Sequence, residues 1–312
     1  MNNIKQLIGQ KFQSGFIVVA FFLVIIVFSV MSPVFRTMSN YLVILRQVCI
    51  LAVIAYGMTF VITAACIDLS VGATVAMTSM VAAQAITAGF GIGMASVLSV
   101  LVGLFIGLIN GLIVAKLRIP SFLATLGMMG IIRGVALSWT KTMPVPLTNP
   151  KFGELFSNAQ IMGVPVIVFW MLGVLAICIL LYNFTPLGNY IKAVGGNAKA
   201  AQYSGVNVSK ITIAVFLVSG FLCGIGGLLQ LARMKTARPD AADFAMDAVT
   251  AVILGGTSLF GGKGSVIFTL IGALLLVSIT NGLVILGVDA NVQQIIKGII
   301  VILAVALGSK SD

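Results

Sequence analysis

Apolar runs long enough to cross a lipid bilayer follow one another along almost the whole chain. A helix rises about 1.5 Å per residue, so the roughly 30 Å hydrocarbon core of a bilayer takes about 20 apolar residues per crossing. We therefore expect an all-α integral membrane protein with about ten transmembrane helices in a single domain, residues 1–312. The expected spans are residues 16–32, 42–63, 71–90, 92–115, 121–139, 163–184, 210–232, 246–258, 265–287 and 292–308.

Charged residues are too scarce to cover a water-exposed surface. They make up 8% of the 312 residues, with 18 Lys+Arg against 7 Asp+Glu, whereas a soluble domain carries about 25%. The basic residues are spread between apolar runs, which favours charges that orient membrane helices over nucleic-acid binding. Histidine is absent and the four cysteines show no CxxC spacing, so no metal site is expected.

The basic residues also predict an orientation. An even number of spans returns the C-terminus to the side of the N-terminus, and a modest excess of Lys and Arg favours that side as the cytoplasm. The first apolar run has no small-residue cleavage site after it, so we expect a retained span rather than a signal peptide. The cytoplasmic side then holds Lys116, Arg118, Lys192, Lys199, Lys210, Lys263 and Lys310. The outer side holds Arg36, Lys141, Lys151, Lys235 and Arg238, with Glu154, Asp240, Asp243 and Asp289.

Two segments interrupt the pattern of full-length spans. Residues 246–258 are too few to cross cleanly, and residues 63–72 are polar within an apolar context. Both are candidate half-helices or re-entrant turns, which membranes tolerate only inside protein or beside water. Whether 246–258 crosses the bilayer or turns back is left open.

A short sequence similarity within the chain suggests an internal repeat. INGLIV at 109–114 recurs as TNGLVI at 280–285, each late in a long apolar span and each preceded by an apolar-to-polar break. This predicts two pseudo-symmetric halves, residues 42–139 and 210–308, an arrangement common in transporters.

Asp68 is the carboxylate that the sequence places most deeply. An ionised carboxylate at bilayer depth costs several kcal/mol unless it is paired or wet. One interpretation is a pathway or gating residue. The other is a helix cap, in which Asp68 or Ser70 accepts hydrogen bonds from the free amides that open the helix at 71–90.

Other polar side chains inside the spans are sparse. A solute that sheds water needs replacement partners, so sparse polarity predicts a pathway that passes solute without holding it tightly. For Asn110 and Asn281, solute contact and hydrogen bonding between helices remain equal alternatives. Arg133 and Lys297 are expected to extend toward the span ends. The polar residues are Gln84, Asn110, Thr125, Arg133, Ser138, Asn281, Gln293 and Lys297.

Glycines recur every four residues on two spans, and this spacing predicts close helix packing. They are Gly103, Gly107 and Gly111 on one span, and Gly220 and Gly224 on the other.

Two connections are long enough to have a function. The outer one, residues 140–162, has three prolines and no helical period. The inner one, residues 185–209, holds a helix-permissive stretch at 197–204 between Gly196 and Gly205. From the residues alone, this stretch is either a docking element or a tight solvated connection.

Residues 255–265 resemble a phosphate-binding loop only superficially. Such a loop needs G-x4-G-K-[ST], because the lysine and the hydroxyl must meet the phosphates and Mg²⁺. Thr257 stands in place of the first glycine, and Gly264 follows Gly262-Lys263. We therefore expect no ATP hydrolysis by this chain, and we expect these glycines to form a sharp turn.

Four separate segments, in order along nearly the whole chain, carry a family resemblance: 67–72 (IDLSVG), 120–127 (PSFLATLG), 193–205 (AVGGNAKAAQYSG) and 254–264 (LGGTSLFGGKG). They resemble the ribose/xylose-type permease subunits of bacterial ABC importers. The resemblance implies a multi-pass protein of the bacterial inner membrane with both termini cytoplasmic. It also implies a second permease copy or sister permease, an external sugar-binding protein, and cytoplasmic ATPase subunits that use ATP and Mg, with no cofactor in this chain.

The resemblance extends to candidate site residues. Seven residues match the cytoplasmic segment that docks the ATPase: Gly195, Gly196, Asn197, Ala200, Ala201, Ser204 and Gly205. Asp68, Ser70 and Gly72 match the signature near the central pathway and join Asn110, Thr125 and Asn281 as pathway or gate candidates.

Two departures leave the identity of the sugar open. Ala65-Cys66 stands where the family usually has glycine, and Ala245 stands where it usually has glutamate, two residues before Asp247.

Two other functions compete with the importer. A secondary transporter driven by H⁺ or Na⁺ would use Asp68 as its central carboxylate. Asp68 has too few acidic neighbours to form an ion relay with them, which argues against this function. A membrane enzyme is disfavoured, because the chain has no histidine and no evident nucleophile–base pair.

Overall fold

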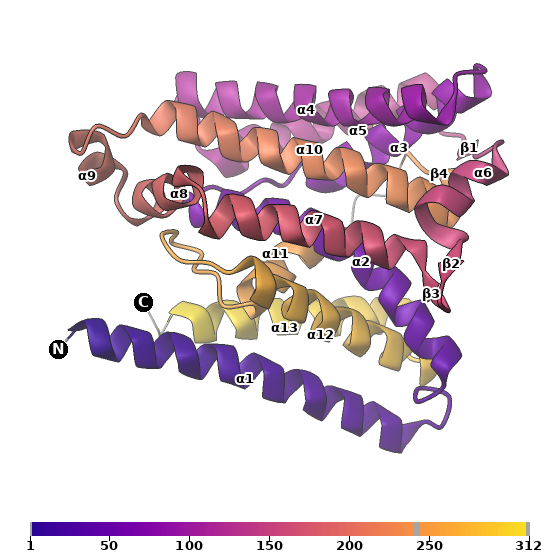
Figure 1. Ribbon diagram of the computed structural model, residues 1–312, viewed down its shortest axis with the longest axis horizontal. Coiled ribbons are helices and arrows are strands. Elements are labelled where there is room, and N and C mark those ends of the chain that lie inside the picture. Colours follow the sequence, from indigo (N-terminus) through magenta and orange to yellow (C-terminus); the bar gives the residue numbers. More distant parts are fainter. Residues whose placement is uncertain (1, 240–243, 310–312) are drawn as a thin grey trace.

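The computed structural model describes residues 2–239 and 244–309 and consists of roughly parallel helices (Figure 1). Six of these helices are long and apolar enough to cross a membrane, which confirms the all-α membrane fold. Asp240, Asp243 and Lys310, which entered the orientation argument, lie outside the described residues. The six helices are α2 (Met38–Thr63), α4 (Ile92–Lys116), α5 (Ser121–Thr140), α7 (Val166–Asn183), α10 (Val208–Met234) and α12 (Val266–Ile285).

Four further helices contain shorter apolar stretches at positions where spans were expected. The shortest has 11 residues, so it is about 16 Å long and crosses only half of a bilayer core. It ends at residue 254 rather than 258, because Gly256 follows with a φ of +78°, which a helix cannot continue through. The four are α1 (Asn2–Met31), α3 (Val71–Thr87), α11 (Phe244–Leu254) and α13 (Ala290–Ser309).

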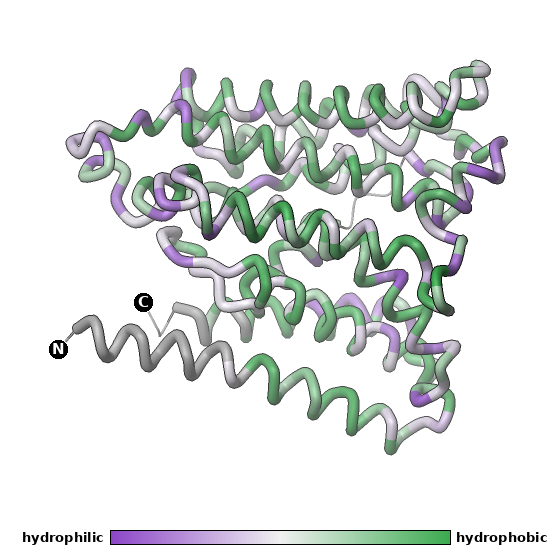
Figure 2. Tube along the Cα trace, viewed as in Figure 1, coloured by the Kyte–Doolittle hydropathy of each residue, from purple (hydrophilic) through white to green (hydrophobic). Residues whose placement is uncertain are grey.

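The two ends of the bundle carry different connections (Figure 1). At one end lie α8 (Pro186–Gly196) and α9 (Ala198–Tyr203), and α1 begins and α13 ends at this same end of the bundle. Hydrophobic residues cover the lengths of the helices and hydrophilic residues gather at the two ends (Figure 2), as a bilayer requires.

The opposite end holds six short pieces of regular structure among the described residues, four of them within residues 140–162, where no helical period was expected. Asn149 accepts a hydrogen bond from the Lys151 amide and Pro150 occupies the first turn, so a single turn can start without an amphipathic period. β1 pairs with β4 and β2 with β3, both antiparallel. The pieces are β1 (Val145–Pro146), α6 (Pro150–Gly153), the π-helix η1 (Glu154–Asn158), β2 (Gln160–Ile161), β3 (Val164–Pro165) and β4 (Thr236–Ala237).

Helix α2 runs through the middle of the bundle. Its apolar stretch is 72% buried, compared with 22–33% for α4, α5 and α7. It contacts α10, α12, α11 and α7. The less buried helices therefore form the rim that faces lipid or another subunit.

The glycine pattern predicted close packing, and the α4–α10 contact confirms it. A Cβ atom at Gly107 would collide with the carbonyl oxygen of Phe216, and one at Gly103 with that of Gly220. A Cβ at Gly224 would lie 2.8 Å from the Cα of Val100. These obstacles are backbone atoms, which cannot rotate away as a side chain can.

Replacing Gly107 with alanine is therefore expected to destabilise the protein. Overpacking of this kind costs about 1–3 kcal/mol, which outweighs the better helix propensity of alanine. Gly127→Ala is the matched control, since no atom lies within 4 Å of its added Cβ. Thermal unfolding in detergent should show a clear loss for Gly107→Ala only, and equal melting of both variants would contradict the packing argument.

Candidate functional site

The Asp68 carboxylate lies buried in the connection between α2 and α3, with 3% of the residue exposed. The Ser70 hydroxyl donates to Oδ1 at 2.6 Å and the Ser70 amide donates to the same oxygen at 3.0 Å. The Ser219 hydroxyl on α10 donates to Oδ2 at 3.1 Å, and the Asn110 side chain on α4 donates to the Ser70 hydroxyl at 2.8 Å. These contacts join α3, α4 and α10 at one buried point.

Residues 67–69 are also bonded to α5. The Ile67 amide donates to the Ser121 hydroxyl at 3.0 Å, and the Leu69 amide donates to the Thr125 hydroxyl at 3.0 Å. Side-chain hydroxyls thus satisfy backbone groups in an extended segment, which membrane proteins require wherever a helix is interrupted.

The structure therefore gathers four of the six predicted pathway residues, Asp68, Ser70, Asn110 and Thr125, around one connection. Gly72 is buried in the first turn of α3 next to them. The capping interpretation holds only in part, because Asp68 accepts the Ser70 amide just before the helix while the Ser70 side chain makes no capping bond.

Asn281 lies elsewhere. Its side-chain oxygen accepts a hydrogen bond from the Asn40 side chain of α2 at 3.0 Å. The interpretation as a hydrogen bond between helices is confirmed for Asn281. Asn110 bonds instead to Ser70, the residue that precedes α3. For both residues, contact with solute stays a prediction.

The predicted docking stretch forms α9, and residues 186–196, for which no helix was expected, form α8. The Asn197 side chain caps α9 by accepting the Ala200 amide at 3.0 Å. Gly205 ends the turn with a φ of +87°. Five of the seven predicted docking residues are exposed, while Gly195 and Ala201 are buried. The exposed ones are Gly196, Asn197, Ala200, Ser204 and Gly205.

Gly195 joins this connection to both interrupted segments. A Cβ atom here would collide with the Thr63 carbonyl oxygen, at the end of α2, and would lie 2.7 Å from the Gly262 amide nitrogen. That amide itself donates to the Thr63 carbonyl at 2.9 Å. Gly261 and Gly262 have φ of +87° and +78°, which favours glycine at both. The breaks at 63–72 and 255–264 therefore meet each other and α8.

Helix α8 is further fixed to α2 and α7. The Lys192 ammonium lies 4.5 Å from the centre of the Tyr182 ring, a cation–π distance. The Tyr182 hydroxyl lies 3.1 Å from the Thr63 hydroxyl. Partial burial lowers the pKa of Lys192 from its usual value.

A cavity of about 890 Å³ opens at this same end of the bundle. Its lining includes Cys66, Arg118, Ser121, Gln202 and Asn207. The cavity thus extends from Cys66, two residues before Asp68, to Gln202 on α9. Its size lies in the range of small-molecule sites, about 300–1,000 Å³.

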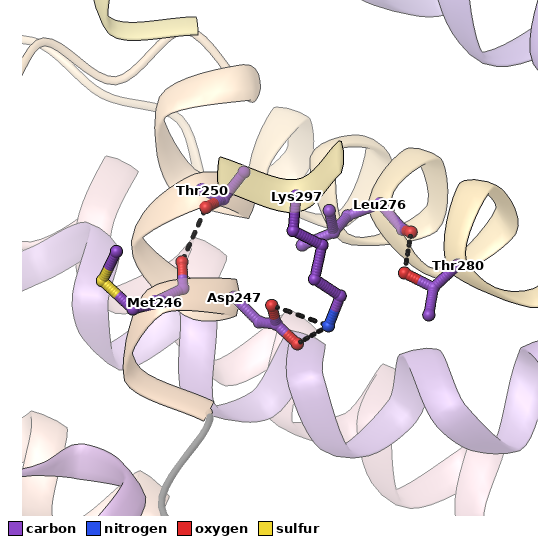
Figure 3. Close-up of polar contacts among 6 residues, drawn as sticks. All are labelled: Met246, Asp247, Thr250, Leu276, Thr280 and Lys297. Carbon is purple, nitrogen blue, oxygen red and sulfur yellow. Dashed lines mark hydrogen bonds and ion pairs between the residues drawn. The ribbon is translucent and has the colours of Figure 1, made fainter. Parts of the chain in front are cut away.

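A second carboxylate, Asp247, was not among the predicted site residues. It lies in the first turn of α11 and pairs with Lys297 of α13, with the ammonium 2.9 and 3.1 Å from the two carboxylate oxygens (Figure 3). Lys297 does not extend to the end of its span as expected, because this partner holds it at the level of α11. The bundle therefore holds at least two carboxylates, Asp68 and Asp247.

The comparisons with known proteins identify the family. Residues 40–305 match the family described as the permease component of branched-chain amino acid transport systems. The chain belongs to this permease family. The permease is 41% identical to the ribose import permease of Escherichia coli (strain K12) over 300 residues, which cover 94% of this chain and 93% of that one.

Two further relatives come from the same strain. The permease is 38% identical to the D-allose transport system permease over 288 residues, covering 91% of this chain and 88% of the relative. It is 34% identical to a probable ABC transporter permease over 304 residues, covering 97% and 91%. No solved structure gives a significant match. Family membership indicates a non-enzymatic membrane subunit.

Proposed function

We propose that the permease forms the membrane channel of a bacterial ABC importer and passes a monosaccharide or a similar small polar solute into the cytoplasm. The observation that carries this is the likeness, over more than nine-tenths of the chain, to permeases named for the import of ribose and D-allose. The sugars in those names favour a polyhydroxylated solute over a branched-chain amino acid.

For the membrane arrangement we propose ten crossings of the bacterial plasma membrane. Six are made by the long helices and three by α1, α3 and α13. The tenth is made by the half-length helix α11 together with the non-helical residues 255–264 that follow it. Both termini are cytoplasmic, together with α8 and α9. The basic residues Lys192 and Lys199 on these short helices support this orientation. The contact between the breaks at 63–72 and 255–264 supports two related halves, residues 42–139 and 210–308.

The connection 185–209 is proposed as the docking element for the ATPase subunit, which binds and hydrolyses ATP with Mg²⁺. The exposed residues Gly196, Asn197, Ala200, Ser204 and Gly205 contact the ATPase. The buried Gly195 and Ala201 hold the element on the bundle. Motion of the ATPase then reaches both interrupted segments through the contacts of Gly195 with Thr63 and Gly262.

The interrupted segment at 67–72 is proposed as the gate. Asp68, Ser70, Asn110 and Thr125 fix its closed form through the hydrogen bonds described above, and Gly72 lies buried beside them. Asn281, bonded to Asn40, contributes to the pathway separately.

Three partners complete the proposed importer. A second copy or a sister permease covers part of the rim formed by the less buried helices, and lipid covers the rest. A solute-binding protein docks at the end that holds β1 to β4, opposite α8 and α9.

The test is reconstitution in nanodiscs with candidate ATPase and solute-binding subunits from the same genome. We expect ATP hydrolysis to rise when the binding protein carries ribose or D-allose, and labelled sugar to enter proteoliposomes only with ATP. Uptake of sugar by the permease alone, driven by an ion gradient without ATP, would overturn the proposal in favour of a secondary transporter.

A further inference from the structure

A cavity of about 390 Å³ lies where α11 and α13 approach α5 and the connection before α3. Leu69 and Met129 form one side, Asp247 and Thr250 on α11 another, and Gln294 and Lys297 on α13 a third. The volume lies within the range of small-molecule sites, about 300–1,000 Å³. Leu69 is the neighbour of Asp68, so the cavity adjoins the gate proposed above.

The Asp247–Lys297 pair is open to this cavity rather than sealed in the core. The Lys297 side chain is 29% exposed and that of Asp247 25%, and both are among the cavity residues. Figure 3 shows Lys297 extending from α13 to the carboxylate on α11. Charged groups among membrane helices pair with one another or face a water-filled cavity, so two paired charges that are still partly exposed favour water over lipid in this cavity.

The two sides of α13 differ in polarity in a way that fits a wet cavity. The cavity residues Gln294, Lys297 and Gly298 are spaced i, i+3 and i+4, which places them on one face of the helix. Ile295 and Ile299, 62% and 51% exposed, lie outside the cavity lining on an apolar face suited to lipid or a second subunit. The polar residues Gln294 and Lys297 of α13 therefore face the cavity.

The first turn of α11, which carries Asp247, lines the cavity. The helix is too short to span a bilayer and ends at the break at 255–264, and it contacts α3, which begins at the other break. In membrane transporters, solute sites are commonly formed by the ends of interrupted helices. Ala245, where the resembling family usually has glutamate, also lines this cavity and leaves Asp247 as a carboxylate in its wall.

We propose that this cavity is a contact site for a neutral, polyhydroxylated solute, with Asp247 accepting hydrogen bonds from its hydroxyls and Lys297 donating one. The proposal rests on the proposed function as a sugar importer. In the empty cavity the two charges satisfy each other. A solute hydroxyl exchanges with one partner at a time, so the solute is held weakly and released readily.

The first test measures access to the cavity in the assembled importer. Cys66, a partly exposed cysteine, is replaced by serine, and Gln294→Cys is compared with Ile295→Cys, its neighbour on the apolar face. A water-soluble maleimide should react about tenfold faster with the cysteine at 294, and excess ribose or D-allose, whichever is transported, should slow that reaction. Equal reaction rates at the two positions, or no protection by the transported sugar, would overturn the site.

The second test removes the charges. Asp247→Asn and Lys297→Met should each lower ATP-driven sugar uptake about tenfold, since each removes a charged hydrogen-bonding partner. The control Lys116→Met, at the exposed end of α4, should transport normally. The charge-exchanged variant D247K/K297D should remain slow.

The outcomes separate the site from the importer. Full uptake by D247K/K297D would mean that the pair only ties α11 to α13, and normal uptake by both single variants would mean that it plays no part; either result overturns the proposal. If a charge variant does not assemble, the labelling at residue 294, which keeps both charges, still decides. A wild-type importer that moves no sugar refutes the proposed function, whereas a working importer with no protection at residue 294 refutes this site alone.

Discussion

Replacing Gly195 with alanine is expected to abolish the coupling of ATP hydrolysis to transport. The added Cβ would collide with the Thr63 carbonyl oxygen and press on the Gly262 amide, and those two groups are hydrogen bonded to each other. Backbone atoms of three segments would have to separate, at a cost of about 1–3 kcal/mol or more. We expect sugar-stimulated ATP hydrolysis in nanodiscs to fall at least about tenfold.

The neighbouring residue is the matched control. An alanine Cβ at Gly196 would lie 4.0 Å from the nearest atom, the Cα of Gly262, and it faces outward. Gly196→Ala should therefore keep most of the stimulated hydrolysis, whereas a bulky Gly196→Trp should block assembly with the ATPase. If the complex that contains Gly195→Ala shows normal sugar-stimulated ATP hydrolysis, the contact of Gly195 with Thr63 and Gly262 does not transmit motion.

Asp68→Ala is expected to cause the largest loss of stability. Removing the carboxylate leaves the hydroxyls of Ser70 and Ser219 and the Ser70 amide without their acceptor in a buried site. Each unsatisfied group costs about 1–3 kcal/mol, so the sum is several kcal/mol. Thermal unfolding in detergent should show a strongly lowered melting temperature, and uptake should be lost.

Two companion variants make this test specific. Asp68→Asn keeps one acceptor oxygen and should recover part of the stability, and Glu154→Ala, an exposed carboxylate at the opposite end, should change little. A stable Asp68→Ala variant that still transports would show that neither the hydrogen-bond network nor the proposed gate depends on this carboxylate.

Local signals predicted much of the helical structure. The glycines at 196 and 205 bracketed a helix-permissive stretch at 197–204, and α9 occupies Ala198–Tyr203 within it. The regularly spaced glycines predicted close packing for the spans that carry them, because a small residue at every fourth position makes a flat helix face; that α4 and α10 pack against each other came from the structure. Helix α8 was missed because three of its eleven residues are glycines; burial of Ile191 and Val194 outweighs that low propensity.

The partners of the charged groups were beyond local reasoning. Ser219 lies 151 positions after Asp68, and Lys297 lies 50 positions after Asp247. Nothing in a stretch of apolar sequence says which faces of two distant helices will meet. A lysine in an apolar run is compatible with either a span end or a buried partner, and only the placement of α11 beside α13 decides between them.

The glycine contact between α4 and α10 limits how this bundle can change shape. Because their backbones are in contact over several turns, the two helices cannot slide or rotate against each other and should move as one rigid body. The connection that holds Asp68 is hydrogen bonded to both helices of this pair, through Asn110 on α4 and Ser219 on α10. Opening and closing of the passage should therefore come from displacement of the Asp68 connection, α11 and α13 relative to this rigid pair, and not from a movement shared by all the helices.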